Sequence, residues 1–99
     1  MIRAIIVEPG KKARTVRINN SMQNFKKIIG GEPELLRLGD NMAAVCDENG
    51  KLKNLPFSGI FKQYFLVGTV ILVGIQGNEV VDFPMSMKEL RNYSGIEFK

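Results

Sequence analysis

The spacing of hydrophobic and polar positions predicts a hairpin at the start of the chain. Residues 2–7 are β-branched and almost all apolar, which is typical of a strand covered on both faces. Residues 15–18 alternate polar with apolar positions, as expected for a second strand with one solvated face. Pro9-Gly10 supplies the turn between them, because proline fixes one φ and glycine accepts a positive one.

A helical period follows the hairpin. Apolar residues recur at i, i+3 and i+7, which predicts a helix over about residues 21–29. We expect Asn20 to cap its N-terminus together with Gln23, and Gly30 to end it in the left-handed conformation. The apolar face of this helix is formed by Met22, Phe25 and Ile29.

The remainder of the chain is read mainly as strands. Asn49-Gly50 suits a two-residue hairpin turn, and Ser86 with Glu89 matches a capping box for a short helix that runs to about Tyr93. Strands that follow one another, with helices set apart, indicate an α+β fold. We therefore expect one small domain over residues 1–99, a mostly antiparallel sheet with one helix packed on a face and a short C-terminal helix. The expected strands are 34–38, 42–46, 51–53, 69–75 as a central strand, and 80–83, with 64–67 as a brief strand or a turn.

Composition excludes several kinds of chemistry. The 99 residues are 44% hydrophobic and 24% charged, as in an ordinary globular domain, and they include no histidine and one cysteine. A disulfide within the chain and zinc sites built on several cysteines are thereby excluded, and the commonest general base is missing. The longest apolar run, residues 64–75, is too short for a membrane span. We expect a cytoplasmic protein without a metal or other cofactor.

The cysteine and the acidic residues in turns are expected to have structural roles. Cys46 ends the apolar run 42–46 and is expected in the core. Asp40, Asp47 and Glu48 fall in predicted turns, where solvated carboxylates are common. An enzyme acting through carboxylates alone would need two of these acids to meet in a pocket. The inventory therefore favours a protein that is not an enzyme, without deciding the question.

Two glycine motifs also have structural interpretations. Gly74-Ile75-Gln76-Gly77 has the G-x-x-G spacing of the loop with which KH domains hold a nucleic-acid backbone. That loop joins two helices, whereas this one follows a β-branched run, so we favour a β-turn. Gly30-Gly31 ends the predicted helix, while phosphates bind at the opposite end, so we interpret this pair as a cap.

Basic residues are concentrated near the start of the chain. The net charge is +4, and residues 1–30 carry seven basic side chains against one acidic one. If the helix folds back antiparallel to strand 15–18, its last turn reaches the first hairpin turn. The resulting cluster would bind nucleic-acid phosphates, or would serve only as a solubilising surface and complement the helix dipole. The cluster consists of Lys11, Lys12, Arg14, Lys26 and Lys27.

Several segments, taken in order, resemble a family of short uncharacterised proteins with a domain of unknown function, found in bacteria, phages and conjugative elements. After Leu55-Pro56 the resemblance leads us to expect an Asn-Arg pair, and Phe57-Ser58 stands there instead. The resemblance implies a similar order of elements and brings no catalytic residues. The segments that carry it are residues 5–12, 30–31, 47–52, 55–56 and 68–74.

Two functions follow as hypotheses. The first is a non-enzymatic accessory or protein-interaction module of phage or mobile-element type, whose partner is an unidentified protein or a second copy of the chain. The alternative is a nucleic-acid-binding protein that uses the basic cluster. Neither hypothesis involves a membrane.

Overall fold

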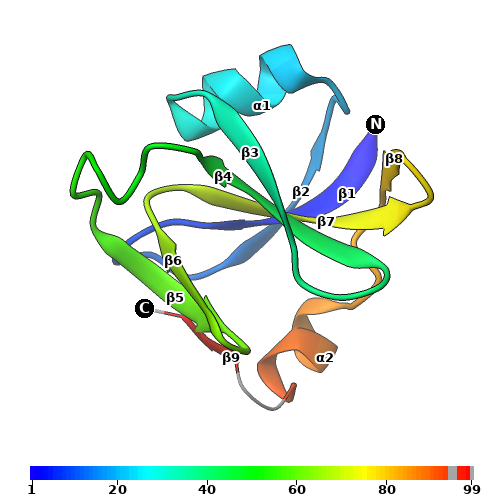
Figure 1. Ribbon diagram of the computed structural model, residues 1–99. Coiled ribbons are helices and arrows are strands. Elements are labelled where there is room, and N and C mark those ends of the chain that lie inside the picture. The colour runs from blue at the N-terminus through cyan, green and yellow to red at the C-terminus, as the bar shows by residue number, and fades with distance from the viewer. Residues whose placement is uncertain (94–95, 99) are drawn as a thin grey trace.

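The computed structural model describes residues 1–93 and 96–98. Figure 1 shows a large sheet through the middle of the molecule, with α1 on one side and a small sheet and α2 on the other. The elements in chain order are β1 (Ile2–Val7), β2 (Arg14–Ile18), α1 (Met22–Ile29), β3 (Pro33–Arg37), β4 (Met42–Asp47), β5 (Phe57–Phe61), β6 (Tyr64–Val67), β7 (Val70–Gln76), β8 (Glu79–Val81), α2 (Met87–Arg91) and β9 (Ile96–Phe98).

The large sheet is built around β7. Its strand order is β2-β1-β7-β4-β3, β8 also pairs with β7, and these pairings are antiparallel. Leu72 of β7 lies opposite Ile5 of β1 on one side and Ala44 of β4 on the other. The apolar run that forms β7 is buried up to Ile75. The prediction of a central strand at 69–75 is confirmed.

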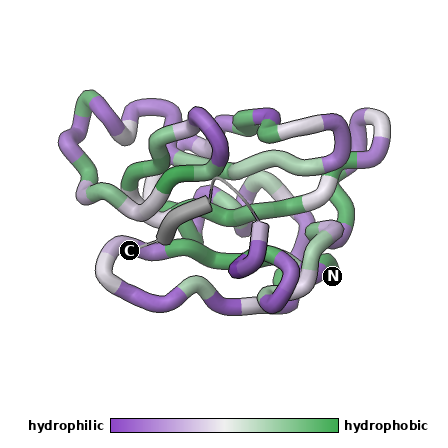
Figure 2. Tube along the Cα trace, turned by 90° about the horizontal axis from the view of Figure 1, so that it is seen from below, coloured by the Kyte–Doolittle hydropathy of each residue, from purple (hydrophilic) through white to green (hydrophobic). Residues whose placement is uncertain are grey.

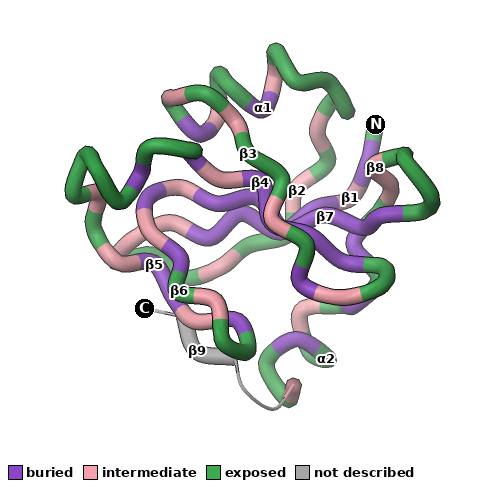
Figure 3. Tube along the Cα trace, in the orientation of Figure 1, coloured by how far each residue is buried: buried purple, intermediate pink, exposed green. Residues whose placement is uncertain are grey.

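Both faces of the large sheet are covered, because alternate side chains of its inner strands point in opposite directions. Ile6 of β1 belongs to a buried cluster with Phe25 and Ile29 of α1. The neighbouring Ile5 belongs to a second cluster, which includes Phe61 of the small sheet. Figure 2 shows the hydrophobic strands inside the molecule and the hydrophilic turns around them, and Figure 3 shows the same strands buried.

The small sheet was not expected from the sequence. Its strand order is β6-β5-β9, and of these strands only residues 64–67 were considered as a possible strand. Ser58 in β5 is fully buried, and its hydroxyl donates a 2.6 Å hydrogen bond to the Gly68 carbonyl. Glycine, serine and aromatic residues in β5 give no strand alternation, so its pairing is decided by tertiary contacts.

The strand expected at 51–53 is wrong. Consecutive turns occupy this region, in which the Lys53 N–H donates to the Asn49 carbonyl at 2.9 Å and the Asn54 N–H to the Lys51 carbonyl at 3.2 Å. Gly50 does not adopt the positive φ that a type I′ hairpin turn requires. The chain therefore leaves the large sheet after β4 and continues into β5.

The first helix begins differently from the prediction. Ser21, not Asn20, is its N-cap, and the Ser21 hydroxyl accepts a hydrogen bond from the Asn24 N–H at 3.2 Å. The Asn20 side chain instead donates to the Val80 carbonyl at 2.6 Å. Met22, expected on the buried face, is 57% exposed at the first turn. Gly30 ends the helix at φ 76°, as predicted.

The end of the chain agrees with the sequence patterns in outline. Ser86 and Glu89 form the predicted capping box of α2, although the helix ends at Arg91. Gln76 pairs with Glu79 across the turn that contains Gly77, at φ 63°. The motif at 74–77 is thus a strand end followed by a β-turn, as favoured over the KH loop.

Candidate functional site

The register of the large sheet places the predicted basic residues at one end of it. Val7 pairs with Val70, and Pro33 pairs with Asp47, so the end of β1 and the start of β3 lie at the same end of the sheet. Helix α1 returns the chain to that end after β2. The ends of β1 and β3 are three strand spacings apart, or roughly 14 Å at about 4.8 Å per spacing.

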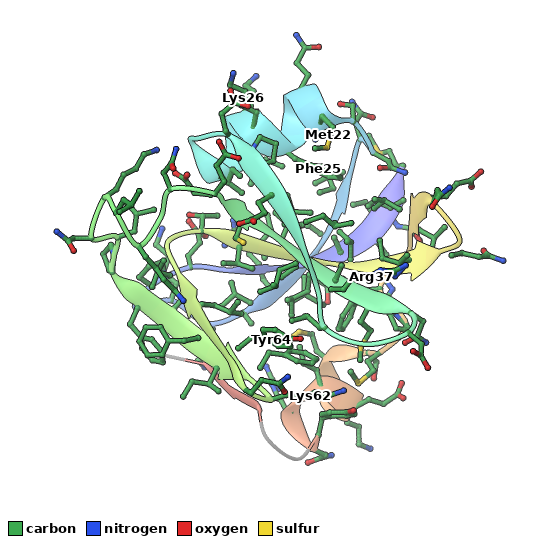
Figure 4. The ribbon with its side chains drawn as sticks, viewed as in Figure 1. Met22, Phe25, Lys26, Arg37, Lys62 and Tyr64 are labelled. Carbon is green, nitrogen blue, oxygen red and sulfur yellow. The ribbon has the colours of Figure 1, made fainter. Side chains whose placement is uncertain are left out.

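Acidic neighbours divide the basic residues into two groups. Around Glu8, Arg14 forms an ion pair and hydrogen bond, and Lys11 lies 3.9 Å away. The hydrogen bond from Arg14 holds the pKa of Glu8 below its usual value. On α1, Lys26 pairs with Glu32 at 2.5 Å, and Figure 4 shows Lys26 on the outer side of the helix.

The two remaining cations of the predicted cluster, Lys12 and Lys27, are exposed. Within the part of the chain that the structure describes, neither forms an ion pair. The strand order and register put both groups towards one end of the sheet, and among the described residues three of the five cations have an acidic partner and two have none.

A cavity of about 210 Å³ opens on the other side of that end, between the β3–β4 pair and β6. Its apolar walls are Leu36, Cys46, Leu52, Phe65, Leu66 and Val67. Its charged rim consists of Glu34, Asp47, Glu48 and Lys51.

The thiol of Cys46 forms part of the cavity wall. Its Sγ lies 3.8 Å from the Glu34 carbonyl oxygen, and the side chain is only partly buried, so the predicted core position is only partly correct. Burial raises the pKa of Cys46 to about 11, and the charges of Glu34 and Asp47 act in the same direction. A thiol that stays protonated at neutral pH is a poor nucleophile.

Asp47 is the second departure from the sequence analysis at this cavity. Its side chain is 3% exposed, whereas Asp40 and Glu48 are exposed as predicted. Asp47 accepts hydrogen bonds from Lys53 Nζ at 2.7 Å and from the Asn49 N–H at 2.9 Å. The Lys53 bond, followed by that from Asn49, holds the pKa of Asp47 below its usual value. This carboxylate fixes the loop after β4.

Strand β3 forms one border of the cavity and one edge of the large sheet. The Leu38 N–H donates to the Met42 carbonyl, and the Glu48 N–H donates to the Glu32 carbonyl. The backbone N–H and C=O groups of the even-numbered residues of β3 therefore point towards β4. Antiparallel pairing alternates, and the N–H and C=O groups of Leu35 and Arg37 therefore point away from the sheet.

Exposed apolar side chains surround this edge and the cavity mouth. Leu35 of β3 is 44% exposed, Phe65 of β6 is 52% exposed, and Leu52 in the loop after β4 is 84% exposed. Phe65 packs against Phe57 with ring centroids 4.6 Å apart and ring planes tilted by 39°, which holds its ring beside the cavity. Unpaired backbone groups beside exposed apolar side chains form a surface suited to contact with another chain.

In a comparison with family models, residues 2–93 match a domain of unknown function, DUF3846. The chain belongs to the DUF3846 family. A search of curated proteins and a search of solved structures each found no match.

Other features of this DUF3846 chain bear on its chemistry. Within residues 1–93 and 96–98, no three cysteine, aspartate or glutamate side chains gather in a way that would hold a metal ion. In the same residues, neither helix has the length and hydrophobicity needed to cross a membrane.

Sequence reasoning missed the β3 edge and the cavity, although it identified strand 34–38. Position in a sheet depends on strand order, which a single strand's pattern does not contain. Pro33 could have indicated that β3 is an edge strand, because proline lacks the N–H of a ladder bond and occurs mostly on edge strands.

Proposed function

We propose that this chain is a non-enzymatic protein-interaction module that binds an extended segment of a partner protein along the β3 edge. The observation that carries the proposal is the outward backbone of Leu35 and Arg37 next to an open, mainly apolar cavity. An extended peptide that adds a strand to a sheet edge gains main-chain hydrogen bonds, and pockets beside the edge select its side chains.

Strand β3 suits this role better than β2, the opposite edge of the large sheet. Thr15 of β2 lies opposite Ile5, whose backbone faces β7, so the Thr15 backbone also points outward. Exposed charged residues stand at equivalent places on both edges, Arg14 and Arg17 on β2 and Glu34 and Arg37 on β3, so the two edges differ in the residue between them, which is the polar Thr15 on β2. On β3 the corresponding central residue is the exposed, apolar Leu35.

The protonated thiol of Cys46 supports a binding role over covalent catalysis. The resemblance to short proteins of bacteria, phages and conjugative elements supports an accessory role in a phage or mobile element. The partner in that setting would be a protein of the host or of the element itself.

The test of the proposal uses the two edges as a matched pair. Leu35→Pro removes an N–H that makes no bond to β4, and Thr15→Pro makes the equivalent change on β2. A displayed library of extended peptides should yield binders that lose affinity at least tenfold with Leu35→Pro and keep it with Thr15→Pro. Urea unfolding shows whether both variants are folded. A library without binders, or binders equally sensitive to both changes, would overturn the proposal.

Nucleic-acid binding is the second candidate, favoured by exposed Lys12 and Lys27 at the same end of the sheet. It predicts a gel shift at about 50 mM salt that weakens steeply as salt rises. Changing Lys26 and Lys27 together to glutamate should abolish the shift. Glu8 and Glu32 compete with phosphate for Arg14 and Lys26, and this competition favours the protein partner.

A further inference from the structure

We infer that the partner segment carries two apolar residues followed by a lysine or arginine and pairs antiparallel with β3. This inference rests on the proposed function and specifies the chemistry of its ligand. It follows from which side chains of β3 border the cavity and which of them carry charge.

The side chains of an added strand would alternate between the two faces of the sheet, in step with those of β3. Glu34 and Leu36 point to the cavity face, and Leu35 points to the opposite face, where it pairs with Val45 of the α1 cluster. Three successive partner residues therefore lie opposite Leu36, Leu35 and Glu34, in that order for an antiparallel strand.

An apolar side chain suits the first of these positions. The cavity next to Leu36 is walled by Cys46, Phe65 and Leu66, and the Cys46 thiol carries no charge at neutral pH. Its volume of about 210 Å³ provides space for a single side chain and not for a folded element. An apolar residue also suits the second position, because it would cover the exposed Leu35.

A basic side chain suits the third position, opposite Glu34. Glu34 and Glu48 are exposed on the cavity rim, and within the described residues neither forms an ion pair. The other rim acid, Asp47, is neutralised by Lys53, and Lys51 is the only positive charge that lines the cavity among those residues. The rim thus keeps an excess of negative charge.

A second copy of the chain fits this site poorly. In an antiparallel pair of β3 strands centred on Leu35, each Leu36 would face Glu34 of the other copy. A carboxylate would then point to the apolar cavity, and Leu36 would stand where a basic residue is favoured. In a pair centred on Leu36, Leu36 would face Leu36, but the buried Leu38 would stand opposite Glu34. Neither register places a basic residue opposite Glu34, which favours a segment of another protein as the occupant.

Fluorescence anisotropy with labelled nine-residue peptides tests the inference. The first peptide has Leu-Val-Lys at its centre, flanked by serine and threonine. The second has glutamate in place of the lysine, and the third has the three central residues reversed. We expect the first peptide to bind, the second to bind at least threefold more weakly because exposed ion pairs are modest, and the third to bind more weakly still.

Charge exchange in the protein provides the control. Glu34→Lys should reverse the preference between the first two peptides, and Glu79→Lys, an equal change at an exposed position on β8, should leave it unchanged. An unreversed preference, or tighter binding of the reversed peptide, would overturn the inference. The proposed function would still stand if binding remained sensitive to Leu35→Pro. If neither these peptides nor the displayed library gave any binding, both would be refuted.

Discussion

Replacing Asp47 with asparagine tests the role of this carboxylate in fixing the loop after β4. Asp47 is almost completely buried and accepts a 2.7 Å hydrogen bond from Lys53 and a 2.9 Å bond from the Asn49 N–H. Asparagine can keep the bond from Asn49 through its carbonyl oxygen. Its amide nitrogen would then face the Lys53 ammonium, so two donors would oppose each other.

The expected loss follows from these contacts. A hydrogen bond to a charged group contributes about 1.5–3 kcal/mol, and the lower end applies because Lys53 is 45% exposed. A buried amide without a partner adds about 1 kcal/mol. Asp47→Asn should therefore lower the free energy of unfolding by about 2–3 kcal/mol. This corresponds to a Tm lower by roughly 10–20 °C for a domain of this size.

Urea unfolding at several pH values provides the assay. Because the pKa of Asp47 is lowered in the folded state, its stabilising contribution is complete above about pH 5. It disappears as the pH falls through the folded pKa. The difference in unfolding free energy between wild type and Asp47→Asn should therefore shrink towards acid. Asp40→Asn, at an exposed turn, is the control with little effect at any pH.

Two results would contradict this reasoning. One is a loss below about 0.5 kcal/mol at pH 7, the range of ordinary surface substitutions. The other is a difference that stays constant down to pH 3, which would mean that the carboxylate charge is not what stabilises the loop.

Three further predictions concern other positions. Gly74→Ala should lower the free energy of unfolding in urea by about 2–3 kcal/mol, because a Cβ would lie 2.0 Å from a backbone oxygen. Gly77→Ala should lower it by about 1–2 kcal/mol, because a Cβ there meets open space and only the positive φ is unfavourable. Equal losses for the two variants would contradict this. Ser58→Ala should cost about 1–2 kcal/mol by leaving a buried carbonyl unpaired, and an unchanged midpoint would refute that. Cys46 should react with a disulfide reagent at pH 7.5 on the order of a hundredfold more slowly than in the urea-unfolded chain, and equal rates would exclude the raised pKa.

Most strands of the large sheet and both helices could be predicted from local sequence patterns. The alternation or continuity of apolar residues located most of its strands, and the capping box located α2. These features depend on neighbours within a few residues, which the sequence contains directly. The N-cap was misplaced by one residue because Asn20 and Ser21 are both good caps, and a distant contact with Val80 engages Asn20.

The candidate site depends on contacts between distant segments. The cavity combines Leu36 and Cys46 of the large sheet with Phe65 of the small sheet, and these meet only when the two sheets pack together. Asp47 occupies a turn in the sequence, yet the Lys53 side chain and Gly31 surround it. A Cβ at Gly31 would lie 2.2 Å from an Asp47 carboxylate oxygen, a constraint that no local pattern expresses.

The central place of β7 has a consequence for how the chain is made on the ribosome. β1 and β4 both hydrogen-bond to β7, which begins only at Val70. While the earlier segments emerge, the β1–β2 and β3–β4 pairs have no strand between them, and the backbone edges of β1 and β4 that face β7 stay open to other molecules. Closing such long loops slows the search for the native state. Nascent chains halted before residue 70 should therefore remain protease-sensitive, whereas those in which residue 76 has left the exit tunnel can complete the sheet.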